Sequence, residues 1–136
     1  MLKQVLFTFI VVIAFTQTTL ANDFPPDTSK SEMVYDMPEQ MPEFPGGSDA
    51  MERFIIDNIK YPPLAKEKRI QGKVYVQFIV EKDGQLTEIK IRRGAHELLD
   101  QEAIRVIKLM PEWKPGSMRG RTVRTRYTVP ITFALS

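Results

Sequence analysis

The chain has 136 residues, 43% of them hydrophobic, with a formal net charge of +2 at pH 7 and no cysteine. This length is enough for one domain with a modest core, and the missing cysteine excludes disulfide bonds and a lipid-modified N-terminal cysteine. Acidic residues dominate positions 23–52 and basic ones positions 114–126, but no recognition helix or aromatic-basic strip accompanies them, which argues against a nucleic-acid partner.

Residues 1–21 have the layout of a secretory signal peptide. Lys3 precedes an uncharged, mostly apolar run from Val5 to Phe15, and Leu20-Ala21 place a small residue at the expected cleavage point. The apolar run is roughly 11 residues long, whereas roughly 20 are needed to span a bilayer core. The sequence therefore predicts an exported protein, with an uncleaved N-terminal anchor as the alternative.

Residues 22–47 are predicted to be a linker that is rich in proline and acidic residues. They contain several prolines and the Gly46-Gly47 pair, and they lack a periodic apolar pattern. Proline favours extended backbone, and at about 3.3 Å per residue this stretch reaches at most about 85 Å. Within it, the motif MPEFPGG is expected to dock on the domain through Phe44.

Residues 48–136 are predicted to form the folded domain, which starts with two helices. Ser48 is the expected N-cap of the first helix, which ends near Lys60 because Pro62 disfavours the helical region for the residue before it. The Pro62-Pro63 pair can start a short second helix, since prolines are tolerated in the first turn. Gly72 is expected to end this helix.

A β-hairpin is predicted over residues 73–93. Apolar residues alternate with others from Lys73 to Lys82, and a second strand returns from Leu86 to Arg93. Asp83-Gly84 lies between them, and this pair is the preferred sequence of a two-residue type I′ turn.

A third helix is predicted over residues 101–110, with Asp100 as its N-cap and Pro111 at its end. Trp113 follows between two prolines. We expect Trp113 to pack against the core as a structural plug, and the alternative is a ring that stacks on a ligand.

The last strand is predicted to run from Thr122 to Ala134. Alternation places two sets of side chains on opposite faces, an apolar set (Val123, Tyr127, Val129, Ile131, Phe133) and a polar set (Arg124, Arg126, Thr128, Thr132). Pro130 cannot donate a ladder hydrogen bond, so this strand is expected at a sheet edge with the proline nitrogen facing outward. The backbones of Arg124, Arg126 and Thr128 then face the open edge as well. The arginines either protect this edge against unwanted pairing or help to bind an added strand, and the sequence alone does not decide between these two roles.

Catalytic and metal-binding patterns are missing from the sequence. His96 is the single histidine and is expected to be a solvated loop residue, while Asp100 and Glu102 are typical of a helix N-terminus. Ser117 lies outside any Gly-x-Ser-x-Gly motif, and no glycine-rich phosphate loop occurs. The sequence predicts a protein that is not an enzyme and has no metal site or cofactor.

Several motifs together indicate a family. They are YPPLAKEKRIQGKVYVQFIV, the turn DGQL, LDQEAIRVIKLMPEWKPG and the closing VRTRYTVPITF, with MPEFPGG upstream. With these motifs the chain resembles TonB family C-terminal domains, of the kind common in Bacteroidetes. The resemblance implies an α+β fold in which two helices pack on one face of a small, about three-stranded antiparallel sheet.

The resemblance also implies a mechanical function in TonB-dependent transport. The domain grips the TonB box, an extended segment of a TonB-dependent outer-membrane transporter, by strand addition, and it passes on force from an inner-membrane proton-driven complex. In the family the last strand receives that segment. Here this implies a site made of Val123, Arg124, Thr125, Arg126, Tyr127, Thr128 and Val129.

Two features distinguish the chain from a full energy transducer. The sequence shows no convincing membrane helix, and its proline-rich linker is short. The alternative prediction is therefore a stand-alone periplasmic interaction module that transfers no force and uses the same edge for another partner or for a homodimer.

Overall fold

The computed structural model describes residues 33–136, which lie in one compact unit. The predicted signal peptide and the first part of the predicted linker lie outside the described residues. Between positions 33 and 136, no helix has the length and apolar character needed to cross a membrane.

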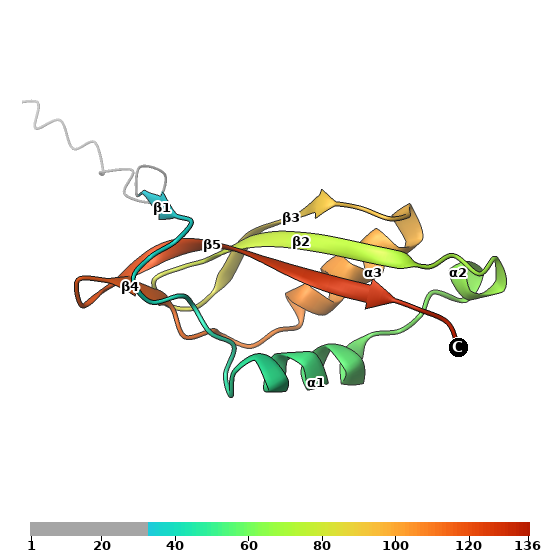
Figure 1. Ribbon diagram of the computed structural model, residues 1–136, viewed down its shortest axis with the longest axis horizontal. Helices are drawn as coiled ribbons and strands as arrows, with labels where there is room; N and C mark the ends of the chain where they lie inside the picture. Colours follow the sequence, from blue (N-terminus) through green and yellow to red (C-terminus); the bar gives the residue numbers. More distant parts are fainter. Residues whose placement is uncertain (1–32) are drawn as a thin grey trace, which may run out of the picture. The chain divides into compact units, whose positions relative to one another are not determined.

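The fold is α+β, as predicted, with two longer helices and one short helix against a curled sheet (Figure 1). In chain order the elements are β1 (Val34–Tyr35), α1 (Ser48–Asn58), α2 (Pro63–Glu67), β2 (Gly72–Val80), β3 (Leu86–Arg93), α3 (Glu97–Lys108), β4 (Gly116–Met118) and β5 (Arg121–Phe133). The predicted three-stranded antiparallel sheet corresponds to β2, β3 and β5. The structure adds β1 and β4, which are too short to give a sequence pattern.

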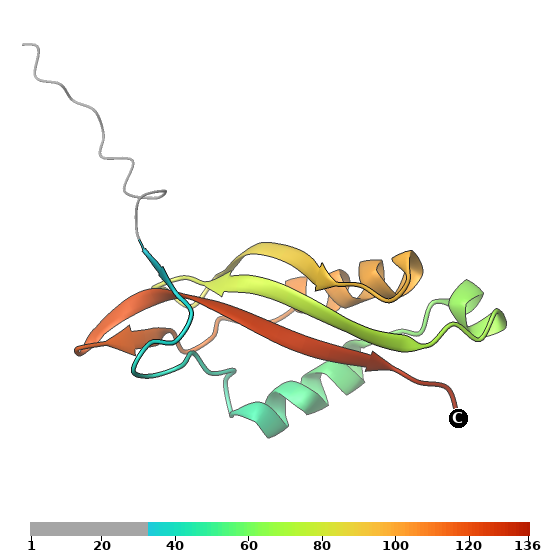
Figure 2. The ribbon, with the colours of Figure 1, turned by 45° about the horizontal axis from the view of Figure 1, so that its top comes forward.

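The strands follow the order β1-β5-β2-β3, and β4 also pairs with β5. β5 runs antiparallel to β2 in an unbroken register from Gly72 opposite Phe133 to Val80 opposite Thr125. β3 pairs antiparallel on the other side of β2, whereas β1 is parallel to β5. β5 therefore lies between β2 and the short N-terminal strand (Figure 2).

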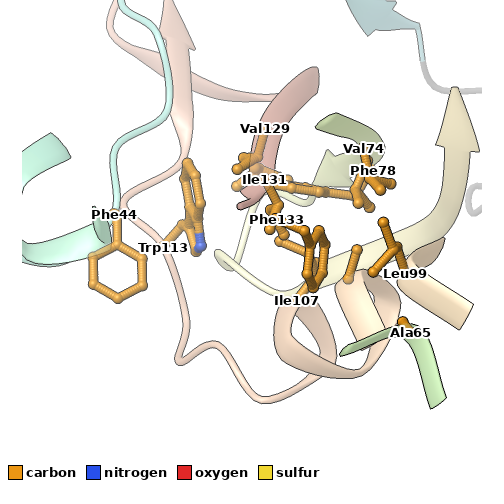
Figure 3. Close-up of a cluster of buried hydrophobic side chains, with 13 residues drawn as sticks. Phe44, Ala65, Val74, Phe78, Leu99, Ile107, Trp113, Val129, Ile131 and Phe133 are labelled. Atoms are coloured by element: carbon orange, nitrogen blue, oxygen red, sulfur yellow. The ribbon is translucent and has the colours of Figure 1, made fainter. Parts of the chain in front are cut away.

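The core lies between one face of the sheet and α3 (Figure 3). The predicted alternation is confirmed, because even-numbered residues of β2 and odd-numbered residues of β5 are buried together with one side of α3: Val74, Val76, Phe78, Val80, Val129, Ile131, Phe133, Leu99, Ala103 and Ile107. Fully burying one such large apolar side chain contributes about 1.5–3 kcal/mol. α1 packs against the same cluster, but none of its residues is fully buried.

The start of α3 differs from the prediction, and Asp100 is not its N-cap. The helix begins at Glu97, and the Nδ1 atom of His96 accepts a hydrogen bond of 3.1 Å from the backbone amide of Leu98. Asp100 accepts a hydrogen bond of 3.0 Å from the amide of Ala95 instead. An unprotonated imidazole nitrogen can fulfil the capping role usually taken by Ser, Thr, Asp or Asn, so the histidine starts the helix earlier.

Two further local expectations are corrected by backbone geometry. Gly47, with φ of 87°, is the N-cap of α1 and Ser48 is already helical, with no side-chain capping bond. The hairpin turn is wider than a two-residue type I′ turn, since the amide of Glu81 donates to the carbonyl of Gln85 and only Gly84 in the turn has a positive φ, of 88°. A three-residue loop with glycine in the left-handed region is the next commonest hairpin connection.

The second part of the predicted linker, residues 33–47, lies within the compact unit. Backbone bridges join Gln40 to Ser117 and Glu43 to Lys114, and Phe44 is only 7% exposed. The expected docking of Phe44 is confirmed. Phe44, two buried prolines (Pro38 and Pro42) and the two bridges hold this stretch, and none of these features forms an apolar period in the sequence.

Candidate strand-docking edge

The predicted site residues, 123–129, all lie on β5, where alternation divides their side chains between two faces. Thr125 and Val129 are buried in the core, so only their backbones can reach a partner. Arg124, Arg126 and Thr128 have their side chains on the face that bears no helices.

The edge of β5 that faces away from β2 has two halves, which we call the occupied half and the open half. The occupied half is 124–125, where β1 pairs with Arg124 and Thr125, whereas residues 121–123 pair with β4. The open half is 126–133, where no strand of the described chain pairs on this side. Pro130 lies in the open half, opposite Tyr75 of β2, and the ladder passes through it without a register shift.

Arg124 forms a partly buried ion pair with Glu81 at the end of β2. Its Nε and Nη2 atoms donate to the two carboxylate oxygens at 2.7 and 3.0 Å, and the two side chains are 11% and 22% exposed. The Arg124 guanidinium, helped by the Thr87 hydroxyl and opposed by partial burial, lowers the pKa of Glu81 below its usual value. This bidentate geometry joins β5 to β2 inside the domain.

Arg126 has a more exposed environment. Its Nη1 atom lies 2.5 Å from the Asp36 carboxylate, directly after β1, with the two side chains 42% and 68% exposed. An open depression of about 780 Å³ lies beside it, where Asp36 and Met41 face Lys90, Arg92, Arg126 and Thr128. Three cations and one acid line this depression, so it favours an acidic partner.

The helix face of the sheet is flanked by α1 along the open half. At one end, Phe54 of α1 packs on Phe44 with ring centroids 5.5 Å apart, and Phe44 packs on Trp113. At the other end, Tyr61 packs on Phe133 at 5.8 Å. Both ribbon views show α1 running alongside this part of β5 (Figures 1 and 2).

Trp113 is a structural plug, as predicted, and the ligand-stacking alternative is wrong. It is 3% exposed and makes edge contacts with Phe44, Phe78 and Tyr127 at centroid distances of 5.8, 5.3 and 5.0 Å. Because the ring is buried among these aromatic side chains, it is not accessible to a stacking ligand.

The polar residues weighed as catalytic groups serve structural roles. His96 caps α3, and Glu102 binds Arg105 and the amide of Lys60. Ser117 donates to the Gln40 side chain at 2.9 Å. Within 33–136, no three His, Asp or Glu side chains are grouped to hold a metal ion.

β1 and Asp36 are the parts of this site that the sequence did not reveal. The only signal is the strand-favouring pair Val34-Tyr35 between acidic residues. Two residues are too few to show a period.

Comparisons with known proteins agree with this architecture. The family model described as Gram-negative bacterial TonB protein C-terminal matches residues 57–135. A solution NMR structure of the Helicobacter pylori TonB C-terminal domain is 25% identical, with a TM-score of 0.52, and the match covers 68% of this chain and 87% of that one. A shorter form of the same domain gives 26% identity and a TM-score of 0.47, over 63% and 90% of the two chains.

A search of the curated proteins gives no match. The family model nevertheless covers more than half of the sequence, over residues 57–135. The chain therefore belongs to the family of Gram-negative bacterial TonB C-terminal domains.

Proposed function

We propose that this domain binds the extended TonB-box segment of an outer-membrane transporter by adding it as a strand to the open half of β5. Domains of this family are non-catalytic, generally periplasmic, and generally interact with outer-membrane transporters in TonB-dependent transport. The observation that carries the proposal is the unpaired side of β5 over residues 126–133. Unpaired amides and carbonyls along an edge are a template for another chain.

Pro130 supports an outward orientation of specific amides. The β2–β5 ladder is uninterrupted at Pro130, which is accommodated when the proline nitrogen points away from β2. Because backbone groups alternate along a strand, the amides of Arg126, Thr128 and Thr132 then point outward too. An added strand would pair with the amides of Thr128 and Thr132 and lose one hydrogen bond at Pro130.

The two sides of the open half differ in chemistry, and this difference predicts the partner's sequence. On the helix side, α1 offers apolar residues that are only partly buried, among them Met51, Phe54 and Ile55. On the other side are Arg126 and the cations of β3. We therefore expect a segment with apolar residues at alternate positions facing α1 and an acidic residue on the opposite face.

The test is an NMR titration of the full chain with TonB-box peptides from transporters of the same organism. We expect backbone amide shifts to change along 126–132. Thr128→Pro should weaken binding by about tenfold, because a lost hydrogen bond is worth about 1 kcal/mol and the ring also obstructs the edge. Thr128→Ala is the matched control, since it keeps the amide. Shifts that leave 126–133 unchanged would contradict the proposal.

Self-association through the same edge is the second candidate, because an open edge accepts a second copy as readily as a transporter segment. β3 is the other edge of the sheet, but it carries an irregular register and a positive φ at Glu88, of 49°, which are features that discourage pairing. Sedimentation at increasing concentration separates the candidates: a dimer that Thr128→Pro abolishes would favour self-association. Force from an inner-membrane proton-driven complex stays a prediction of the family resemblance.

A further inference from the structure

The N-terminal segment of the domain lies on the same edge that the proposed function uses. β1 is parallel to β5, with Val34 beside Arg124 and Tyr35 beside Thr125. Asp36 comes next and forms an ion pair with Arg126, the first residue of the open half. The chain thus supplies its own short strand, which reaches the beginning of the free edge (Figure 2).

This strand is held weakly. Neither Val34 nor Tyr35 is buried, and the flanking Met33 and Met37 are 69% and 87% exposed. The ion pair between Asp36 and Arg126 is exposed on both sides, so water and salt screen it. Few contacts and solvent-exposed backbone bonds are typical of segments that open locally.

The next part of the chain is held more firmly and at a different place. Gln40 and Glu43 pair with Ser117 and Lys114, and Phe44 is buried against Trp113. β1 can therefore leave β5 while the segment from Gln40 onward stays attached to the domain.

We propose that β1 is a displaceable self-strand, which occupies part of the β5 edge until a partner strand takes its place. The proposal rests on the proposed function, because it concerns the regulation of the same edge. A partner strand that extends from the open half toward Arg124 must replace Val34 and Tyr35. An acidic side chain of that partner would replace Asp36 at Arg126. In the free protein, β1 shortens the exposed edge and so limits unwanted pairing.

The first test removes the self-strand. The double substitution Val34→Pro, Tyr35→Pro removes both β1 amides and leaves the attachment at Gln40, Glu43 and Phe44 intact. We expect TonB-box peptides to bind the full-length variant about 3–10-fold more tightly, measured by calorimetry, because the competing state is lost. Met33→Pro is the matched control, since Met33 lies outside the two ladder pairs, and its affinity should equal that of the wild type.

A milder variant keeps the backbone of β1. Asp36→Asn removes the charge that meets Arg126, and we expect a smaller gain in affinity, of about twofold, that shrinks as salt is added. This variant keeps the proposal testable if the double proline substitution fails to fold.

A synthetic peptide of residues 32–37 tests the self-strand without any transporter segment. It should bind the double proline variant at residues 124–126, seen as amide shift changes, and should bind the wild type more weakly. If the 32–37 peptide does not bind the double proline variant, the self-strand proposal is overturned.

The remaining outcomes separate the two proposals. Equal or weaker TonB-box affinity in the double proline variant would overturn the self-strand and leave the proposed function standing. TonB-box peptides that perturb neither protein, together with a 32–37 peptide that binds, would overturn the proposed function alone.

Discussion

The two halves of the β5 edge share one alternating sequence, yet they have different surroundings. In the occupied half, the Arg124 side chain is 11% exposed and paired with Glu81, the residue directly after β2. In the open half, Arg126 is 42% exposed and its partner Asp36 lies on a weakly held segment. Alternation decides which side chains are buried, but segments distant in the sequence decide whether an edge is free. The first arginine therefore forms an internal ion pair, whereas the second is exposed, and we propose that it meets a partner.

Removing Trp113 should disrupt the packing that joins the open half of β5 to β2 and to the N-terminal segment, and it has the largest expected effect. Its ring contacts Tyr127 in the open half, Phe78 of β2, and Phe44, which anchors the N-terminal segment. Trp113→Ala should lower the free energy of unfolding by about 3–5 kcal/mol, measured by urea denaturation. Leu109→Ala, at a side chain 50% exposed, is the control and should change it by less than about 0.5 kcal/mol. A loss below about 1 kcal/mol for Trp113→Ala would show that the ring is not a plug.

Substituting Arg124 should affect stability more than binding. Arg124→Ala leaves the partly buried Glu81 carboxylate without its bidentate partner, so we expect a loss of about 1–3 kcal/mol in the free energy of unfolding. The affinity of the variant for a TonB-box peptide should stay close to that of the wild type at temperatures where it is folded. If the free energy of unfolding of Arg124→Ala equals that of the wild type, Arg124 does not stabilise the domain and does not differ from Arg126 in this respect.

The same pair predicts a dependence of stability on pH. The hydrogen bonds from Arg124 hold the pKa of the Glu81 carboxyl below its ordinary value of 4.5, so the stabilisation is fully present above that pH and is lost as the pH falls below it. The free energy of unfolding should therefore fall from about pH 6 to about pH 3, and this fall should be smaller in Arg124→Ala. If the free energy of unfolding falls equally with pH in the two proteins, groups other than Glu81 cause the acid sensitivity.

Substituting Arg126 should have the smallest effect on stability and should act on binding instead. Its ion pair is exposed on both sides, so Arg126→Ala should change the free energy of unfolding by less than about 0.5 kcal/mol. Affinity for a TonB-box peptide with an acidic residue should fall about 2–5-fold, whereas affinity for the same peptide with an amide in its place should change less. Calorimetry of both peptides measures the difference, and equal losses would exclude Arg126 as the residue that recognises the acid.

The main elements could be predicted from the sequence because their apolar periods, and the prolines and glycines that end them, are local features of the sequence. The alternation in β2 and β5, the prolines before α2 and Pro111 after α3 indicated the order of elements. Pro130 predicted an edge strand with the Arg124 backbone facing an open edge, and this is wrong at Arg124 and Thr125, where β1 pairs with β5. The start of α3 was wrong because a histidine is an uncommon cap. Short local signals of this kind need no knowledge of distant contacts.

The division of the edge could not be predicted, because it depends on contacts between distant positions. Asp36 and Arg126 are separated by 90 positions in the sequence. β1 has two residues, and the stretch after it is held by Phe44 and two isolated bridges rather than by a repeating pattern. The sequence therefore indicated the strand that we propose as the site, and the structure divides the edge of that strand into an occupied and an open half.

Contacts between an isotope-labelled TonB-box peptide and the full chain, measured by intermolecular NOEs, test the central claim most directly. The account predicts NOEs from the peptide backbone to the amides of Arg126, Thr128 and Thr132, and from its apolar side chains to α1. NOEs to the β3 edge, over Leu86–Arg93, with none to β5 would contradict it.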